Sequence, residues 1–129
     1  MGMNEAEYWI EMAQYDLETA KAMNRTKRYL YVGFICHLVI EKALKACYIV
    51  RLRKTPPYIH NLALLAEKAG LYSEMSEQQK DFLDFLEPLN IEVRYPTRKN
   101  KLLAMLNDEK CYDMISRTEG LLEWVMKTF

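Results

Sequence analysis

The fold of this chain is decided by the stretch YLYVGFICHLVIEKALKACYIVRLR, residues Tyr29–Arg53. It contains no proline, and Gly33 is its one weak helix breaker, so the stretch predicts a single long helix. Apolar residues occur almost all round this helix, which is the pattern of a helix enclosed by others. We therefore expect it to be buried.

One polar stripe interrupts the apolar surface of this helix. His37, Glu41 and Lys45 follow one another at steps of four residues, so they share a face. A buried carboxylate without a partner is costly, and Glu41 should therefore contact His37, Lys45 or an arginine from elsewhere in the chain. Two interpretations stay open: these side chains satisfy one another inside the core, or they form the floor of a ligand site.

A helix is also expected before this segment. Asn4 and Glu7 have the spacing of a capping box, which predicts that a helix of about 20 residues begins there. Its core positions at helical spacing are Trp9, Met12, Ala13, Leu17 and Ala20. The polar segment Asn24 to Arg28 forms a turn into the long helix. Thr55-Pro56-Pro57 ends the long helix, because proline lacks an N–H and disfavours helical geometry in the residue before it.

Two further helices are predicted in the middle of the chain. A short one fits Asn61 to Ala69, and Gly70 ends it. A second capping box, formed by Ser76 and Gln79, opens the next helix. The side chains that these two helices should bury are Leu62, Leu65, Ala66, Ala69, Phe82, Phe85, Leu86 and Leu89.

The last third of the chain is predicted to contain one loop and one helix. Val93 to Lys99, around Pro96, should be extended or looped. A final helix begins at about Asp108, and its core positions are Met114, Thr118, Leu121, Leu122 and Val125. Some five helices without an alternating strand pattern predict an all-α bundle. With 129 residues the chain suits one domain, residues 1–129.

Most catalytic and metal-binding signatures are absent. The sequence has no glycine-rich phosphate loop, no Cys-x-x-Cys pair, no His-Glu-x-x-His and no Gly-x-Ser-x-Gly. His37, His60 and the three cysteines have no recognised zinc spacing. Cys36 and Cys47 lie about 16 Å apart along one helix, too far for a disulfide. We therefore expect neither a metal nor a cofactor.

The sequence also predicts a protein without a membrane segment. Its longest nearly apolar run, Tyr29 to Ile40, is interrupted by His37 and is shorter than the ~20 residues that a bilayer requires. The first residues carry Glu5, Glu7 and Glu11, where a signal peptide would carry basic residues. A cytoplasmic location is the expectation that follows.

The 18 basic and 18 acidic side chains are unevenly distributed, although the net charge is zero. Residues 1–24 carry a net charge of −4, and residues 25–54 a net charge of +7. Residues 55–93 are again acidic at −5, residues 94–106 carry +4, and residues 107–129 carry −2. Two basic segments separated by acidic ones could meet in space and form a positive patch; the alternative is a mixed surface charge without function.

Arg94-Tyr95-Pro96 is a second candidate for chemistry. Arginine binds phosphate with two hydrogen bonds, and tyrosine can stack on a base. The cations that would extend this surface are Arg98, Lys99 and Lys101. The alternative is a solvated basic loop with Tyr95 in the core. Asp16, in the apolar stripe of the first helix, is a suitable internal partner for an arginine such as Arg94.

Four motifs in this order resemble the HEPN family (higher eukaryotes and prokaryotes nucleotide-binding domain). The first is Ala13-x-x-Asp16-Leu17-x-x-Ala20, and the second is Val39-Ile40-Glu41-Lys42-Ala43-Leu44-Lys45-Ala46. Thr55-Pro56-Pro57-x-x-His60-Asn61-Leu62 is similar to the family's Thr-x-Pro-x-x-His-Asp-Leu segment. Arg94-Tyr95-Pro96 matches its Arg-Tyr-Pro element. Together the motifs span about residues 9–96.

This resemblance implies a four- to five-helix up-and-down bundle that forms a homodimer, with a groove for nucleotide or RNA near the dimer interface. It also implies a minimal nucleotidyltransferase partner in a toxin–antitoxin pair. Many members are metal-independent RNases that carry Arg and His with four to six residues between them. From Arg94 these positions hold Lys99, Asn100 and Lys101, and the family's His-Asp-Leu is His-Asn-Leu here. Both departures weaken the RNase interpretation.

We therefore expect a nucleotide- or RNA-binding domain that is non-catalytic or catalytically degenerate. The residues expected at its site are Arg94, Tyr95, Lys99, Lys101, His37, Glu41, Lys45 and His60. One alternative is an RNase with a displaced catalytic set, such as Arg94 with His37 or His60. The other is a helical interaction protein, whose contact face Tyr8, Tyr15, Trp124 and Met126 would mark if they are exposed.

Overall fold

The computed structural model describes residues 3–92 and 96–129, and within these ranges the chain is helical without a strand. Its elements are α1 (Met3–Arg25), α2 (Tyr29–Leu52), α3 (Leu62–Lys68), the 3₁₀ turn η1 (Tyr72–Glu74), α4 (Glu77–Leu86), α5 (Leu89–Glu92), α6 (Pro96–Met105) and α7 (Asp108–Lys127). The predicted all-α fold is confirmed.

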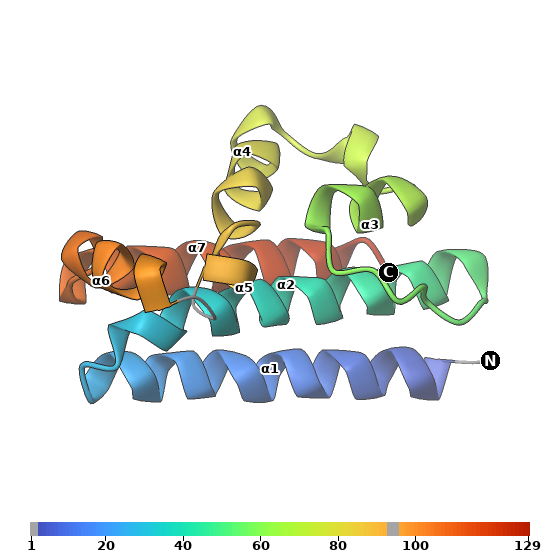
Figure 1. Cartoon of the computed structure of the whole chain (residues 1–129). Helices are drawn as coiled ribbons and strands as arrows, with labels where there is room; N and C mark the ends of the chain where they lie inside the picture. The colour runs from blue at the N-terminus through green and yellow to red at the C-terminus, as the bar shows by residue number, and fades with distance from the viewer. Residues whose placement is uncertain (1–2, 93–95) are drawn as a thin grey trace.

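The three long helices form the body of the domain (Figure 1). α1 and α2 run in opposite directions, and α7 packs beside both and runs in the direction of α2. The chain returns between α2 and α7 along the upper side of α2. A regular up-and-down bundle makes that return with one helix, but here it is divided into α3, η1, α4 and α5.

α2 is buried along nearly its whole length, as its sequence predicts. The other α-helices, α1 and α3 to α7, all contact it. Among its fully buried apolar side chains are Val39, Ile40 and Leu44. Cys36, Cys47 and Cys111 are buried and free, which confirms that the two cysteines of α2 do not pair with each other. The same enclosure places the polar stripe of α2 inside the protein.

Capping side chains define where the middle helices begin. The Ser76 hydroxyl accepts a hydrogen bond from the Gln79 amide (3.1 Å), and the Gln79 side chain accepts one from the Ser76 amide (2.8 Å). This reciprocal pair is the predicted capping box, and it opens α4. At α3, the Asn61 side chain accepts a hydrogen bond from the Leu64 amide (2.9 Å). Both predicted helix starts are confirmed within one residue.

Three predictions from the sequence are wrong. Asn4 is not an N-cap, because α1 begins at Met3 and Asn4 lies inside it. Residues 96–99 are not extended: Pro96 is the first residue of α6, a position where its fixed φ suits a helix, while residues 93–95 lie outside the described ranges. Phe85 is not buried but 48% exposed, because it lies on the outer side of Phe82, against which its ring stacks.

In the ranges 3–92 and 96–129, none of the helices combines the length and the apolar character that crossing a bilayer requires.

Gly33 allows α5 to approach α2 closely. A Cβ atom at this position would lie 2.7 Å from Leu89 Cδ1 and 3.3 Å from Leu89 Cβ. Distances this short would force the Leu89 side chain away from its site in the core. A glycine in the longest helix is therefore explained by the packing of the return segment on it.

We predict that Gly33→Ala destabilises the protein by about 1–3 kcal/mol, because overpacking outweighs the gain in helix propensity. Urea unfolding followed by circular dichroism measures the change. In a Leu89→Ala background the 2.7 Å contact with Cδ1 is gone and only the 3.3 Å contact with Cβ remains, so there Gly33→Ala should cost clearly less than in the wild type. An equal effect of Gly33→Ala in both backgrounds would contradict the close contact.

Candidate functional site

Five polar side chains meet beside the middle of α2, and we call them the polar cluster: His37, Glu41, Lys45, His60 and Glu87. Three of them form the stripe of α2. His37 has no exposed surface, and Glu41 and Lys45 are each 5% exposed. The stripe is therefore part of the interior in this conformation, and solvent reaches the cluster at its edge, through His60.

Glu41 is the centre of the polar cluster. Its Oε2 accepts a hydrogen bond from Lys45 Nζ (3.1 Å) and lies 2.9 Å from His60 Nδ1. The Lys45 ammonium group also lies 5.4 Å from the centre of the Trp9 ring on α1, a cation–π contact. A lysine of the same helix and a histidine of the following loop therefore compensate the buried carboxylate, as the first interpretation of the stripe requires.

His37 lies between two carboxylates without a direct hydrogen bond to either. Its Nδ1 is 3.6 Å from Glu41 Oε1, and its Nε2 is 3.7 Å from Glu87 Oε1. Both ring nitrogens lack a hydrogen-bond partner within the part of the chain that the structure describes. Burial lowers the pKa of His37, and the two carboxylates oppose this effect. The ring is therefore stabilised in its neutral form.

The His60-Asn61-Leu62 segment connects α2, α3 and α4. His60 contacts Glu41 of α2, and Asn61 caps α3. The Leu62 amide donates a hydrogen bond to Oε1 of Glu87, directly after α4 (2.7 Å). Pro56 and Pro57 precede this segment and keep it out of helical geometry. The segment therefore holds the return part of the chain against α2.

The His60 ring connects a buried carboxylate to solvent. Its side chain is 64% exposed, and its Nδ1 lies 2.9 Å from Glu41 Oε2. In the tautomer in which Nδ1 donates to the carboxylate, Nε2 is left as an acceptor. A carboxylate–imidazole pair of this geometry is the arrangement of a general base.

Asp16 has a buried cationic partner within the described residues. Asp16 Oδ2 accepts a hydrogen bond from Lys42 Nζ at 2.5 Å, and both side chains are mostly buried. The suggested arginine, Arg94, lies outside the described residues. Lys42 directly follows Glu41, about 100° further round α2, so it points toward α1 rather than into the polar cluster. The pair joins α1 to α2.

The basic segment 25–54 is not one continuous surface. Ion pairs neutralise three of its eight cations: Lys42 with Asp16, Lys45 with Glu41, and Arg51 with Glu74 (2.6 Å). The remaining exposed cations are Arg25, Lys27 and Arg28 at the start of α2, and Arg53 and Lys54 after its end. The 24 residues of α2 separate these two groups by about 36 Å.

The second basic segment lies near only one of these groups. α6 carries Lys99 and Lys101 and packs against α2, at the end of the bundle where α1 turns into α2 (Figure 1). Lys101 is exposed. We call the exposed cations Arg25, Lys27, Arg28 and Lys101 the basic end. In the described ranges none of these four side chains forms an ion pair.

The eight candidate residues therefore fall into separate groups. The structure brings His37, Glu41, Lys45 and His60 together in the polar cluster. Lys101 belongs to the basic end, and Lys99 is in the same helix. Arg94 and Tyr95 lie outside the described residues.

Sequence reasoning missed Glu87, the fifth member of the polar cluster. The one sequence signal that points to such a residue is that a buried histidine and glutamate need further partners.

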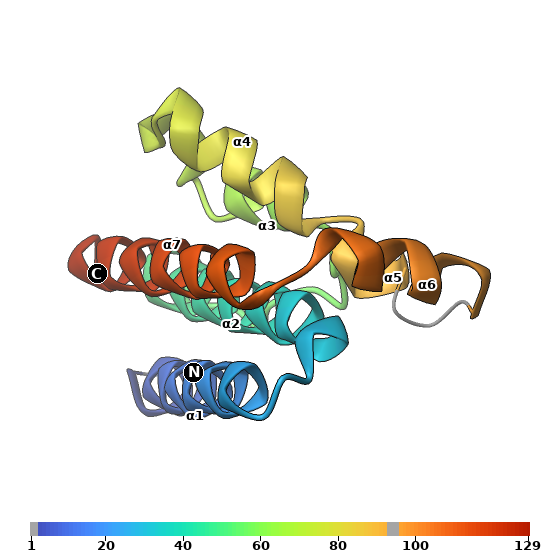
Figure 2. The same ribbon diagram turned by 90° about the vertical axis from the view of Figure 1, so that its left-hand side faces the viewer.

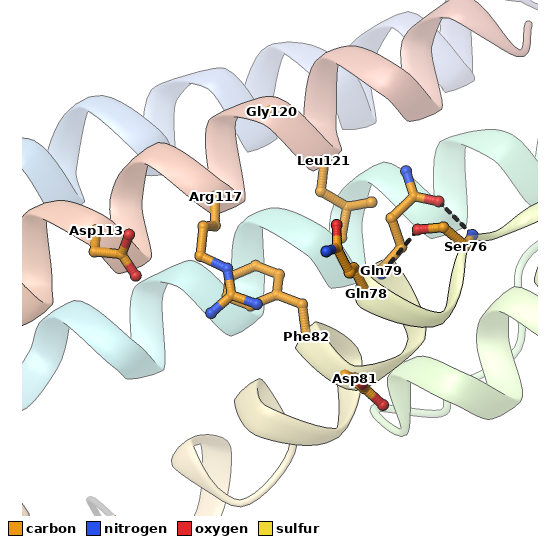
Figure 3. A pocket seen from close by; sticks show the side chains of 9 residues that line it. All are labelled: Ser76, Gln78, Gln79, Asp81, Phe82, Asp113, Arg117, Gly120 and Leu121. Atoms are coloured by element: carbon orange, nitrogen blue, oxygen red, sulfur yellow. Dashed lines mark hydrogen bonds between the residues drawn. The ribbon is translucent and has the colours of Figure 1, made fainter.

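A groove between α4 and α7 was also not predicted. Figure 3 shows its central part, where the Arg117 guanidinium of α7 lies 4.4 Å from the centre of the Phe82 ring of α4. The groove consists of two adjoining hollows of about 650 and 730 Å³, which share Asp113 and Arg117. The second hollow is lined by exposed apolar side chains of three elements. They are Phe85, Met105 and Tyr112.

Comparison with known proteins gives a family match and a fold match. The family model "HEPN domain" matches residues 6–128. The crystal structure of TT1696 from Thermus thermophilus is similar to this chain with a TM-score of 0.83 and 18% sequence identity. The alignment covers 98% of this chain and 99% of that one. No curated protein matches.

We predict that Glu41→Gln destabilises the protein by about 3 kcal/mol, because it leaves Lys45 buried without a counter-charge. Chemical unfolding at pH 7 measures the loss. Adding Lys45→Met should recover part of it. Asp16→Asn is the matched control, since it breaks a less buried pair and should cost less. A Glu41→Gln variant as stable as the wild type would show that Glu41 does not carry this network.

The lowered pKa of His37 predicts a pH dependence of stability. Below its unfolded pKa of about 6.5 the unfolded chain binds the proton more readily than the folded one, so stability falls as the pH falls from 7.5 to 5. The slope from this group is at most about 1.4 kcal/mol per pH unit. His37→Gln should flatten the curve in this range. Parallel curves for the two proteins would contradict the assignment.

Proposed function

The chain belongs to the HEPN domain family, and on that premise we propose that it is a nucleotide- or RNA-binding protein that is non-catalytic or catalytically degenerate. In this proposal it forms a homodimer and works with a minimal nucleotidyltransferase partner in a toxin–antitoxin-type pair. The family is a nucleotide- and RNA-related group of helical domains, which supports the class of ligand. The exposed cations of the basic end also support it.

The observation that carries the proposal is the basic end. Arg25, Lys27 and Arg28 are exposed at the turn between α1 and α2, and Lys101 is exposed on the neighbouring α6. Cations that lack an ion pair among the described residues and converge on one end of a neutral molecule favour a polyanion there, because binding a phosphate chain releases its condensed counterions. Arg94 immediately precedes the short segment that leads into α6, so its place in the sequence is consistent with this surface.

The absence of a suitably placed histidine supports a binding function without catalysis. At the positions separated from Arg94 by four to six residues, 99–101, the chain has no histidine. Both histidines belong to the polar cluster, where His37 is fully buried. An RNase that uses no metal needs a group that accepts or donates a proton next to the cleaved phosphate. Within the family motif this sequence does not provide one.

One observation favours the RNase alternative. His60 is largely exposed, and Glu41 orients its ring so that Nε2 can accept a proton. In a displaced catalytic set, His60 would act as the base and Arg94 would bind the phosphate.

The third alternative, a helical interaction protein, has partial support. Tyr8 and Tyr15 are 60% and 70% exposed on α1. Trp124 and Met126, by contrast, pack partly against the core.

We predict that a fluorescein-labelled single-stranded RNA binds the protein with an affinity that falls with salt. The slope is roughly 0.7 log unit of affinity per log unit of salt for each phosphate contacted. Arg28→Gln with Lys101→Gln should weaken binding and reduce the slope by about 1.4, because two contacts are lost. Fluorescence anisotropy over a salt series measures both quantities. Arg94→Ala should weaken binding as well.

The matched control is Lys54→Gln with Lys68→Gln, which removes two exposed charges away from the basic end. It should leave the salt slope unchanged. Equal effects of the two double variants would mean that binding follows net charge and not the basic end. No detectable binding at low salt, for the wild type and for Arg94→Ala, would refute the proposal. Titrations with ATP in the same buffer distinguish a mononucleotide ligand from RNA.

A cleavage assay with purified protein and EDTA separates the RNase alternative from the proposal. The proposal predicts intact RNA after prolonged incubation. Cleavage that disappears in both Arg94→Ala and His60→Ala would establish the displaced catalytic set instead. Cleavage that persists in both variants would indicate a contaminating nuclease.

A further inference from the structure

The exposed face of α7 has an unusual order of charges. Asp113, Arg117, Gly120, Glu123 and Lys127 are all exposed, and the charged residues lie seven and three positions before and after the glycine. At about 100° per residue, all of them fall within about 60° of Gly120 around the helix. The charges read negative, positive, glycine, negative, positive. Each charge therefore has an opposite charge at the same distance on the other side of Gly120.

This order is complementary to itself in one orientation. If a second copy of α7 crosses the first in the antiparallel direction at Gly120, Asp113 lies opposite Lys127 and Arg117 lies opposite Glu123. A two-fold axis through Gly120 makes each of these pairs twice. A parallel pair in the same register would instead place like charges opposite one another. The pattern therefore selects the two-fold antiparallel arrangement.

The fold of one chain leaves three of these four charges without a partner among the described residues. In the described ranges Asp113, Glu123 and Lys127 form neither an ion pair nor a hydrogen bond. The Arg117 guanidinium is held over the Phe82 ring at the wall of the groove, as Figure 3 shows. Its side chain is thereby positioned on the open face, where a carboxylate from outside can reach it.

Gly120 is a second, independent observation. Glycine inside a helix costs about 1 kcal/mol relative to alanine. A Cβ atom at Gly120 would have no neighbour within 4 Å, unlike one at Gly33, and no positive φ occurs at this residue. Packing within the chain therefore does not require a glycine here. A missing side chain at the crossing point lets the backbone of a second helix approach closely.

The surface beside α7 supplies the apolar contact that charges alone do not. Phe85, Met105 and Tyr112 are 48%, 56% and 69% exposed around the groove next to the N-terminal half of α7. In the antiparallel arrangement the C-terminal half of the other α7, with its half-buried Trp124, lies over this region. Exposed apolar side chains grouped on one face are typical of an interaction surface.

We propose that α7 is the interface between two copies of this chain, which cross antiparallel at Gly120 with Asp113 paired to Lys127 and Arg117 to Glu123 of the other copy. This inference rests on the homodimer in the proposed function and assigns its surface. The partner is a second copy because the four charges nearest to Gly120 on this face, Asp113, Arg117, Glu123 and Lys127, complement one another within the same sequence.

Analytical ultracentrifugation of the full chain over a concentration series tests the interface. The wild type should be a dimer. Asp113→Lys and Lys127→Glu each turn two attractive pairs into repulsive ones, so each should weaken the dimer about tenfold or more. The double variant Asp113→Lys/Lys127→Glu restores opposite charges and should dimerise as the wild type does. Asp84→Lys, the same change on the outer face of α4, should have no effect.

Gly120→Ala separates the interface from the fold. The substitution should raise the melting temperature of the monomer, because alanine favours the helix and meets no neighbour. The dimer should nevertheless weaken, because the added methyl group separates the two backbones. Circular dichroism below the dissociation constant and sedimentation above it measure the two effects.

A monomer at all concentrations overturns the interface, and so does a dimer that tolerates both single reversals or is not rescued by the double variant. A dimer that ignores the reversals leaves the proposed homodimer intact and removes only α7 from it. RNA anisotropy on the same samples distinguishes this failure from a failure of the proposed ligand class, since a monomer that binds RNA contradicts the interface and the homodimer but not the RNA binding.

Discussion

A carboxylate inside a helical core must have positive charge and hydrogen-bond donors beside it, and Glu41 imposes this condition on α2 and on the segment before α3. Lys45 meets part of it from the same helix, and His60 meets the rest from the segment before α3. To place His60 there, the chain must return along α2 after Pro57. That return puts Glu87 beside Leu62, and it positions α3 and α4 above the middle of α2.

Ion pairing also determines where free positive charge remains on the surface. α2 and its flanks carry eight of the basic residues, but Lys42 and Lys45 are used inside the bundle and Arg51 is paired with Glu74. The cations left over lie at the two ends of a long helix. At one of these ends α6 adds Lys101. The net charge of zero therefore describes the whole molecule and no particular surface. Figure 2 shows α6, beside α5, projecting to the right of α1, α2 and α7.

The candidate site could be predicted only in part, and the reason differs between residues. His37, Glu41 and Lys45 share a face because helical periodicity is local, so their grouping follows from spacing alone. Asp16 was recognisable as a buried charge, but its partner depends on the rotation of α1 against α2, which no spacing within either helix determines. Glu87 joins the polar cluster from 46 residues beyond Glu41 in the chain. Phe85 was assigned to the core because periodicity gives one apolar face and does not show where the groove beside α7 opens that face to solvent.

The sequence by itself determined the helical class, the buried central helix and its polar stripe, the capping box of α4 and the order of charges along α7. Each of these depends on residues within a few turns of one another. Only the tertiary structure decided that the return segment is divided into short helices, that the basic segment is split between two ends, and that the charged face of α7 is open to solvent. These properties depend on how long helices pack and on the path of the chain between them, and contacts between residues distant in the sequence set both.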